Sequence, residues 1–113
     1  MKPVYLDYNA TTPTEKEVAE EIKTVLDNTF GNPSSSHVYG QEARKVIETA
    51  RVKIARLINC EPCEIIFTSG STESNNLAIA GFARKNKLKG NHIITSTIEH
   101  PAVSEVCKHL EKE

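Results

Sequence analysis

The sequence predicts an α/β fold in which helices alternate with the strands of a parallel sheet. Two short runs of consecutive apolar residues lie at positions 65–67 and 93–94. Neither run alternates with polar residues, which is typical of strands buried on both faces. A segment with helical spacing of apolar residues separates the two runs, and another follows the second. This order implies parallel strands joined by a right-handed crossover.

The composition is typical of a soluble globular protein. Of 113 residues, 38% are hydrophobic and 26% charged, with 14 Lys and Arg against 15 Asp and Glu. This even balance argues against a nucleic-acid partner, because phosphate contacts need a basic excess. No apolar run approaches the ~20 residues of a membrane span, and we expect neither a membrane partner nor an export signal. The odd number of three cysteines favours a reducing, cytoplasmic compartment.

Residues 1–14 are expected to form an N-terminal arm that precedes two helices. Thr14 and Glu17 have the spacing of a capping box. Apolar residues recur at helical spacing after them, which predicts a first helix over about 15–28. The same criterion predicts a second helix over about 40–58. A loop rich in Gly, Pro and Ser joins these two helices, which together form the segment 15–58.

Residues 59–113 are predicted to begin the sheet-containing part of the fold. A helix over about 72–87 follows the first strand, and a second helix begins after the second strand near Pro101, a residue favoured at a first helical position. Two strands alone bury too little apolar surface for a stable sheet, and a third strand normally follows within a few residues. We therefore interpret residues 1–113 as a single incomplete unit, the front part of a larger α/β protein.

The strongest candidate site is the turn between the first predicted strand and the helix after it. The turn reads Thr68-Ser69-Gly70-Ser71-Thr72. The first amides of a helix lack internal partners and carry partial positive charge, while Ser71 and Thr72 add hydroxyl donors. Gly70 allows close approach of the backbone, so the turn suits a phosphate group, although the lysine of a P-loop is missing. A capped turn without a ligand is the alternative interpretation.

A second candidate, His100, lies at the carboxyl end of the second predicted strand. This is the same sheet edge as the turn, where a neutral imidazole can stack on an aromatic ligand or transfer a proton. A purely structural His is the alternative. Cys60 and Cys63 have C-x-x-C spacing, but they follow the end of a helix instead of its start, which disfavours redox chemistry. Cys107 lies on a different helix, so we expect no zinc site.

Four blocks of the sequence resemble the N-terminal part of the NifS/IscS-type cysteine desulfurases. These enzymes belong to the class-V aminotransferase group of pyridoxal-phosphate enzymes. The blocks occur in the right order, cover nearly the whole chain and are specific when taken together. They are Tyr5–Pro13, Phe30–Ser35 with His37, Ile65–Leu77 and Ile93–His100. The resemblance implies that the chain begins the large domain of a fold-type-I pyridoxal-phosphate enzyme, truncated here.

Carried onto this sequence, the resemblance implies that Gly70, Ser71 and Thr72 bind the phosphate of pyridoxal 5′-phosphate. It implies that His100 stacks on the cofactor ring and assists proton transfer. The implied reaction converts L-cysteine to L-alanine and passes the sulfur to an enzyme cysteine as a persulfide. The implied partners are a second copy in a homodimer and a sulfur-acceptor protein, such as a scaffold for iron–sulfur cluster assembly.

The family's cofactor-binding lysine and its nucleophilic cysteine have no matching segment in this sequence. We therefore expect the chain alone to be inactive. One alternative is a non-catalytic, truncated module that binds anions or a partner protein. Another is part of a different class-V enzyme, such as a selenocysteine lyase. The sequence assigns no role to His37, Cys60, Cys63 or Cys107.

Overall fold

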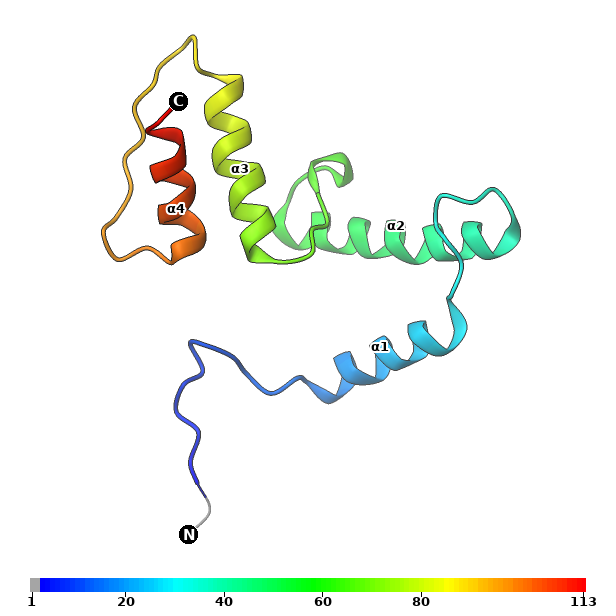
Figure 1. Cartoon of the computed structure of the whole chain (residues 1–113). Helices are drawn as coiled ribbons and strands as arrows, with labels where there is room; N and C mark the ends of the chain where they lie inside the picture. Colours follow the sequence, from blue (N-terminus) through cyan, green and yellow to red (C-terminus); the bar gives the residue numbers. More distant parts are fainter. Residues whose placement is uncertain (1–2) are drawn as a thin grey trace. The chain divides into compact units, whose positions relative to one another are not determined.

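The computed structural model describes residues 3–113 and shows four α-helices and one short 3-10 helix in this range (Figure 1). The predicted helices are confirmed, with bounds close to those expected from the sequence. The elements are α1 (Lys16–Asn28), α2 (Val38–Ile58), the 3-10 helix η1 (Pro62–Glu64), α3 (Ser71–Lys85) and α4 (Pro101–Leu110).

The two predicted strands are wrong for the part of the chain that the structure describes, which contains no strand. Residues 65–67 and 93–94 lie in connecting segments. A helix satisfies its backbone groups internally, whereas a strand needs a neighbouring strand to pair with. Neither segment has such a neighbour among the described residues. An apolar run alone is therefore not sufficient to form a strand. Residues 3–113 therefore contain the helices of the predicted α/β arrangement without its strands.

The chain divides into two compact units, Met1–Ile65 and Ile66–Glu113. In the first, η1 packs against α2. In the second, α3 packs against α4, and both helices begin at the same end of the pair (Figure 1). This parallel arrangement of successive helices is the one that the predicted crossover implies. The assignment of residues 59–113 to the start of a cofactor-binding domain remains a prediction.

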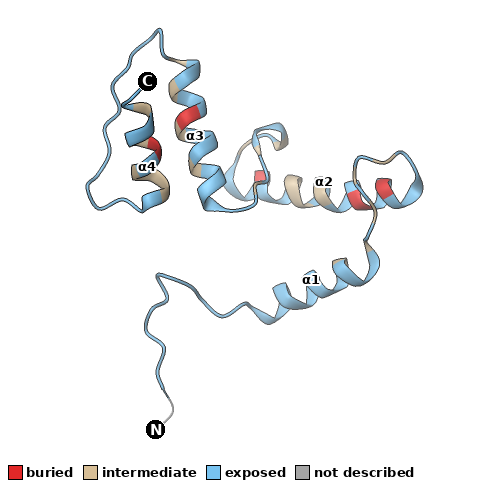
Figure 2. Ribbon diagram, in the orientation of Figure 1, coloured by how far each residue is buried: buried red, intermediate tan, exposed pale blue. Residues whose placement is uncertain are grey.

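Few side chains of the described residues are buried (Figure 2). The buried apolar side chains are Ala43 and Ala55 on α2, Ala80 on α3 and Val106 on α4. Large apolar side chains remain exposed, as on Phe30, where 78% of the surface is accessible. Since hydrophobic stabilisation scales with the apolar area removed from water, each unit has a small core and low expected stability.

The start of α1 differs from the sequence prediction. The helix begins at Lys16, and its N-cap, Glu15, makes no side-chain capping hydrogen bond. The capping box proposed for Thr14 and Glu17 is therefore wrong. A capping box needs the acidic residue at the third helical position, whereas Glu17 occupies the second.

The loop between α1 and α2 folds tightly against the first turn of α2. A Cβ atom on Gly40 would lie 2.4 Å from the carbonyl oxygen of Ser35 and 2.7 Å from that of Asn32. A Cβ on Gly31 would lie 2.2 Å from the carbonyl oxygen of Tyr39. Both positions therefore require glycine, because only an absent side chain permits this backbone approach.

His37, to which the sequence assigned no role, is the N-cap of α2. Its Nδ1 accepts a hydrogen bond from the Gly40 N–H at 3.4 Å, which satisfies one of the free amides of the first turn. The Tyr39 ring lies edge-on to the His37 ring, with centroids 6.2 Å apart, and 5.2 Å from the Phe30 ring. The cap and the rings together order the loop that carries this histidine.

Arg51 links α2 to the segment that follows η1. Its Nη1 donates to the carbonyl oxygen of Ile65, and its Nε donates to the Glu48 carboxylate at 3.1 and 3.2 Å. The Arg51 guanidinium thus provides a hydrogen-bond donor for the carbonyl of the residue that follows η1. The Glu48 carboxylate, also on α2, orients the guanidinium. Side-chain hydrogen bonds of this kind add to the small apolar core of the first unit.

Replacing Gly40 with Ala is expected to open the contact between the loop and α2, because the new Cβ overlaps two backbone oxygens. Overpacking of this kind costs about 1–3 kcal/mol. Amide hydrogen exchange of Ala43 and its neighbours in α2 should therefore accelerate roughly tenfold or more.

Gly81→Ala is the matched control, because a Cβ at this α3 position meets no atom within 4 Å. This substitution should slow exchange in α3, since Ala favours a helix over Gly by about 1 kcal/mol. Unchanged exchange in α2 of the Gly40→Ala variant would contradict the proposed close contact.

Candidate functional site

The predicted phosphate-binding turn lies at the N-terminus of α3. Gly70 is the N-cap, with extended backbone, and Ser71 and Thr72 are the first two helical residues. In the described part of the chain, the N–H groups of Ser71, Thr72 and Glu73 donate to no other group. The Ser74 N–H is the first to be satisfied, by the Gly70 carbonyl at 3.1 Å. Three amides and two exposed hydroxyls are thus available to an anion.

Side chains of α3 hold the loop that precedes it. Oε2 of Glu73 accepts hydrogen bonds from the Ser69 N–H at 2.7 Å and from the Ser69 hydroxyl at 2.6 Å. A further hydrogen bond joins the hydroxyls of Thr68 and Ser74 at 2.7 Å. The two bonds from Ser69, first that of its hydroxyl and then that of its amide, lower the pKa of Glu73. The carboxylate is therefore held in its charged form.

The sequence interpretation missed the role of Glu73. A glutamate at the third helical position is the acidic half of a capping box, and this signal is present in the sequence. The N-cap itself is Gly70, which has no side chain to complete the box. Glu73 therefore reaches one residue further back, to Ser69, a partner that only the folded loop reveals.

His100 is the N-cap of α4. Its Nδ1 accepts a hydrogen bond from the Ala102 N–H at 3.1 Å, and Pro101 occupies the first helical position. Because Nδ1 acts as the acceptor, the proton of the neutral ring is on Nε2. The hydrogen bond also fixes the orientation of the imidazole relative to α4. One ring nitrogen is structural, and the other is free for a ligand.

The structure brings Thr72 and His100 to one groove between α3 and α4, with a volume of about 660 Å³. Gly70 and Ser71 adjoin Thr72 at the end of α3 without lining the groove. Predicted to share a sheet edge, Thr72 and His100 are instead brought together by helix packing. The remaining lining residues are Asn76, Ala80, Arg84, Pro101, Ala102, Glu105, Val106 and His109.

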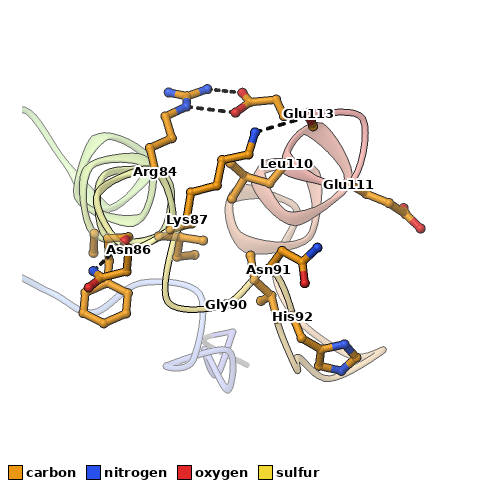
Figure 3. Close-up of a pocket in the computed structure, with 14 residues that line it drawn as sticks. Arg84, Asn86, Lys87, Gly90, Asn91, His92, Leu110, Glu111 and Glu113 are labelled. Carbon is orange, nitrogen blue, oxygen red and sulfur yellow. Dashed lines mark hydrogen bonds and ion pairs between the residues drawn. The ribbon is translucent and has the colours of Figure 1, made fainter.

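A second hollow, of about 680 Å³, lies near the C-terminal ends of α3 and α4 (Figure 3). At its rim the Arg84 guanidinium donates to the Glu113 carboxylate, and Lys87 Nζ donates to the Glu113 carbonyl at 3.3 Å. The hydrogen-bonded ion pair raises the pKa of Arg84 and lowers that of Glu113. The hollow contains none of the sequence-predicted site residues, so it is not the candidate site.

All three cysteines are free thiols. Partial burial raises the pKa of the Cys60 thiol, and the carboxylates of Glu64 and Glu61 raise it further. A raised pKa reduces the thiolate fraction and hence the reactivity of this cysteine. Among residues 3–113, no group of three or more His, Cys, Asp or Glu side chains is arranged to bind a metal ion.

The helices in the described range include none that combines the length and the apolar character needed to cross a membrane.

The sequence matches the aminotransferase class-V family over residues 4–113, and the chain belongs to this family. It is 59% identical over 111 residues to the cysteine desulfurase IscS of Dictyoglomus turgidum and 55% identical over 112 residues to that of Neisseria meningitidis. Each alignment covers 98% of this chain and 28% of the relative. The chain thus spans less than a third of these relatives and matches their N-terminal part.

Solved structures agree with this assignment. A NifS-like protein superimposes with a TM-score of 0.89 and 41% identity, over 96% of this chain and 30% of the other. DndA from Streptomyces lividans superimposes with a TM-score of 0.77 and 45% identity, over 96% of this chain and 31% of the other. The resemblance to NifS/IscS-type enzymes is therefore confirmed. Class-V aminotransferases and cysteine desulfurases are pyridoxal-phosphate enzymes.

Two substitutions of His100 distinguish its role as the N-cap of α4 from the role of its imidazole ring. His100→Ala removes both and should destabilise the first turn of α4 by about 1 kcal/mol, the usual contribution of a side-chain cap. His100→Asn retains a capping oxygen and should preserve the turn. Amide exchange of Val103 and Ser104 measures the effect. Equal exchange in the two variants would contradict the capping role.

Proposed function

We propose that this chain forms the phosphate- and ring-binding part of a pyridoxal-phosphate-dependent cysteine desulfurase. In this proposal it begins the large domain of a fold-type-I enzyme. The observation that carries the proposal is that Thr72 and His100 line one groove, with unpaired amides at its end. Membership of the class-V family supports the choice of cofactor.

The donor set fits the phosphate of this cofactor. The N–H groups of Ser71, Thr72 and Glu73 and the two hydroxyls present donors at the positive end of the α3 dipole. Hydrogen bonds to a charged acceptor contribute about 1.5–3 kcal/mol each. No lysine or arginine is needed in this turn, because the helix itself supplies the positive potential. Ser71 and Thr72 would thus bind and orient the phosphate.

His100 would contact the aromatic ring of the cofactor. Since the Ala102 N–H donates to Nδ1, the imidazole keeps one orientation, and its Nε2–H can donate a hydrogen bond in the groove. An imidazole face also suits stacking on an aromatic ring. When bound, the cofactor supplies the electron-accepting ring that permits chemistry at the α-carbon of an amino acid. The contribution of this chain is to bind and orient the cofactor and to hold a proton at His100 Nε2, which donates a hydrogen bond in the groove.

The proposed substrate is L-cysteine, which would yield L-alanine while its sulfur passes to an enzyme cysteine as a persulfide. The support is the name of the curated relatives, cysteine desulfurase IscS. None of the three cysteines of this chain lies in a segment that matches the family's nucleophile, and no lysine here matches its cofactor-binding lysine. The proposal therefore assigns these two steps to residues outside positions 1–113.

The proposed partners are a second copy in a homodimer and a sulfur acceptor such as an iron–sulfur scaffold protein. Exposed apolar side chains, such as Leu26 and Phe30, support an assembly in which further protein covers them. A cytoplasmic location is part of the same proposal, supported by the odd cysteine count.

A chimeric enzyme tests the proposed function. Residues 1–113 replace the aligned segment of the Neisseria meningitidis IscS, which is 55% identical over 112 residues. The chimera should retain pyridoxal phosphate, measured by its visible absorbance, and release alanine from L-cysteine. Ser71→Ala with Thr72→Ala should lower cofactor affinity roughly tenfold or more, because two charge-assisted donors are lost.

Ser104→Ala, on α4 at a position that does not line the groove, serves as the matched control and should retain the cofactor. The 113-residue chain alone should release no alanine. A folded chimera without cofactor would contradict the proposed function, as would full occupancy after the double substitution.

A further inference from the structure

We infer that Glu73 is a positioning residue that holds the loop Thr68–Gly70 so that the first amides of α3 stay open to a phosphate. The inference rests on the proposed function and extends it, because Glu73 would act through Ser69 without touching the cofactor. Its carboxylate accepts the Ser69 amide at 2.7 Å and the Ser69 hydroxyl at 2.6 Å.

Two consecutive loop residues are bound by two consecutive residues of α3. Glu73 holds Ser69, and Ser74 holds Thr68 through the 2.7 Å contact between their hydroxyls. The Ser74 hydroxyl also donates to the Gly70 carbonyl at 3.2 Å. Because these bonds all run from the loop to the first turn, they define the path of the chain into α3. Glu73 supplies the only charged group in this set.

The direction of the Glu73 side chain explains how a carboxylate can lie beside an anion site. Its Oε2 points back to Ser69 and accepts none of the free amides of Ser71, Thr72 or Glu73 itself. A carboxylate in the first turn also stabilises the helix through its dipole. Glu73 therefore stabilises the loop while leaving the phosphate donors free, whereas a side-chain cap at position 70 would occupy one of them.

The pH dependence follows from the same bonds. They lower the Glu73 pKa below its ordinary value of 4.5, so the loop is held at neutral pH and released only as pH falls through the lowered pKa. The titratable groups facing the adjoining groove are Arg84 on α3 and His100, Glu105 and His109 on α4. None of them contributes to the shift, so the titration reports Glu73 and its partner Ser69.

The test uses the ¹⁵N-labelled 113-residue chain and follows the Ser69 amide by NMR as pH is lowered. In the wild type, this resonance should shift with a midpoint below 4.5. Glu73→Gln should abolish the shift and accelerate exchange of the Ser69 amide, whereas Ser69→Ala should keep the titration of the remaining amide bond. Glu42→Gln, on the exposed surface of α2, is the matched control and should leave the Ser69 amide unchanged.

The second readout is binding of inorganic phosphate and of pyridoxamine 5′-phosphate, which carries no aldehyde to react with surface lysines. Shifts of the Ser71, Thr72 and Glu73 amides should report binding, weakened about tenfold in Glu73→Gln. Equal binding by the wild type and this variant would overturn the inference alone. An absent titration of the Ser69 amide would also overturn it. No binding by a wild type whose Ser69 amide titrates would overturn the proposed function.

Discussion

The packing of α3 against α4 is the interaction on which the candidate site depends. Ala80 and Val106 are buried on these two helices and line the same groove as Thr72 and His100. Both helices begin at the same end of the pair (Figure 1), and the groove between them is lined by Thr72 from the first turn of α3 and by His100, the N-cap of α4. A shift of either helix would separate the phosphate donors from the ring.

The N-termini of α2, α3 and α4 differ in how their first amides are satisfied. α2 and α4 are capped by their own histidines, His37 and His100, which satisfy amides in the first turn. α3 begins at Gly70, which has no side chain, and its first three amides remain free. The stability that a cap would add comes instead from Glu73, through Ser69. Of these three helices, only α3 leaves all of its first three amides open to a phosphate.

The candidate site lies on helices that have a small apolar core and depend mainly on local interactions for stability. A few buried side chains and side-chain hydrogen bonds hold each unit, while large apolar side chains such as Phe82 stay 72% exposed. Such units open locally at low free-energy cost. Hydrogen exchange and NMR of individual amides therefore report on this chain more directly than a single unfolding midpoint does. The same exposed surface is what further protein would cover in the proposed desulfurase.

The sequence by itself determined the helices and the chemistry at their ends. Backbone hydrogen bonds in a helix join residues four apart, so apolar periodicity in the sequence predicted α1 to α4. The hydroxyls of Ser71 and Thr72 and the imidazole of His100 are likewise visible in the sequence as candidate binding groups. Strands and grooves depend on residues far apart in the sequence. Only the tertiary structure could therefore decide that the runs at 65–67 and 93–94 stay unpaired, that Thr72 meets His100, and that Glu73 holds Ser69.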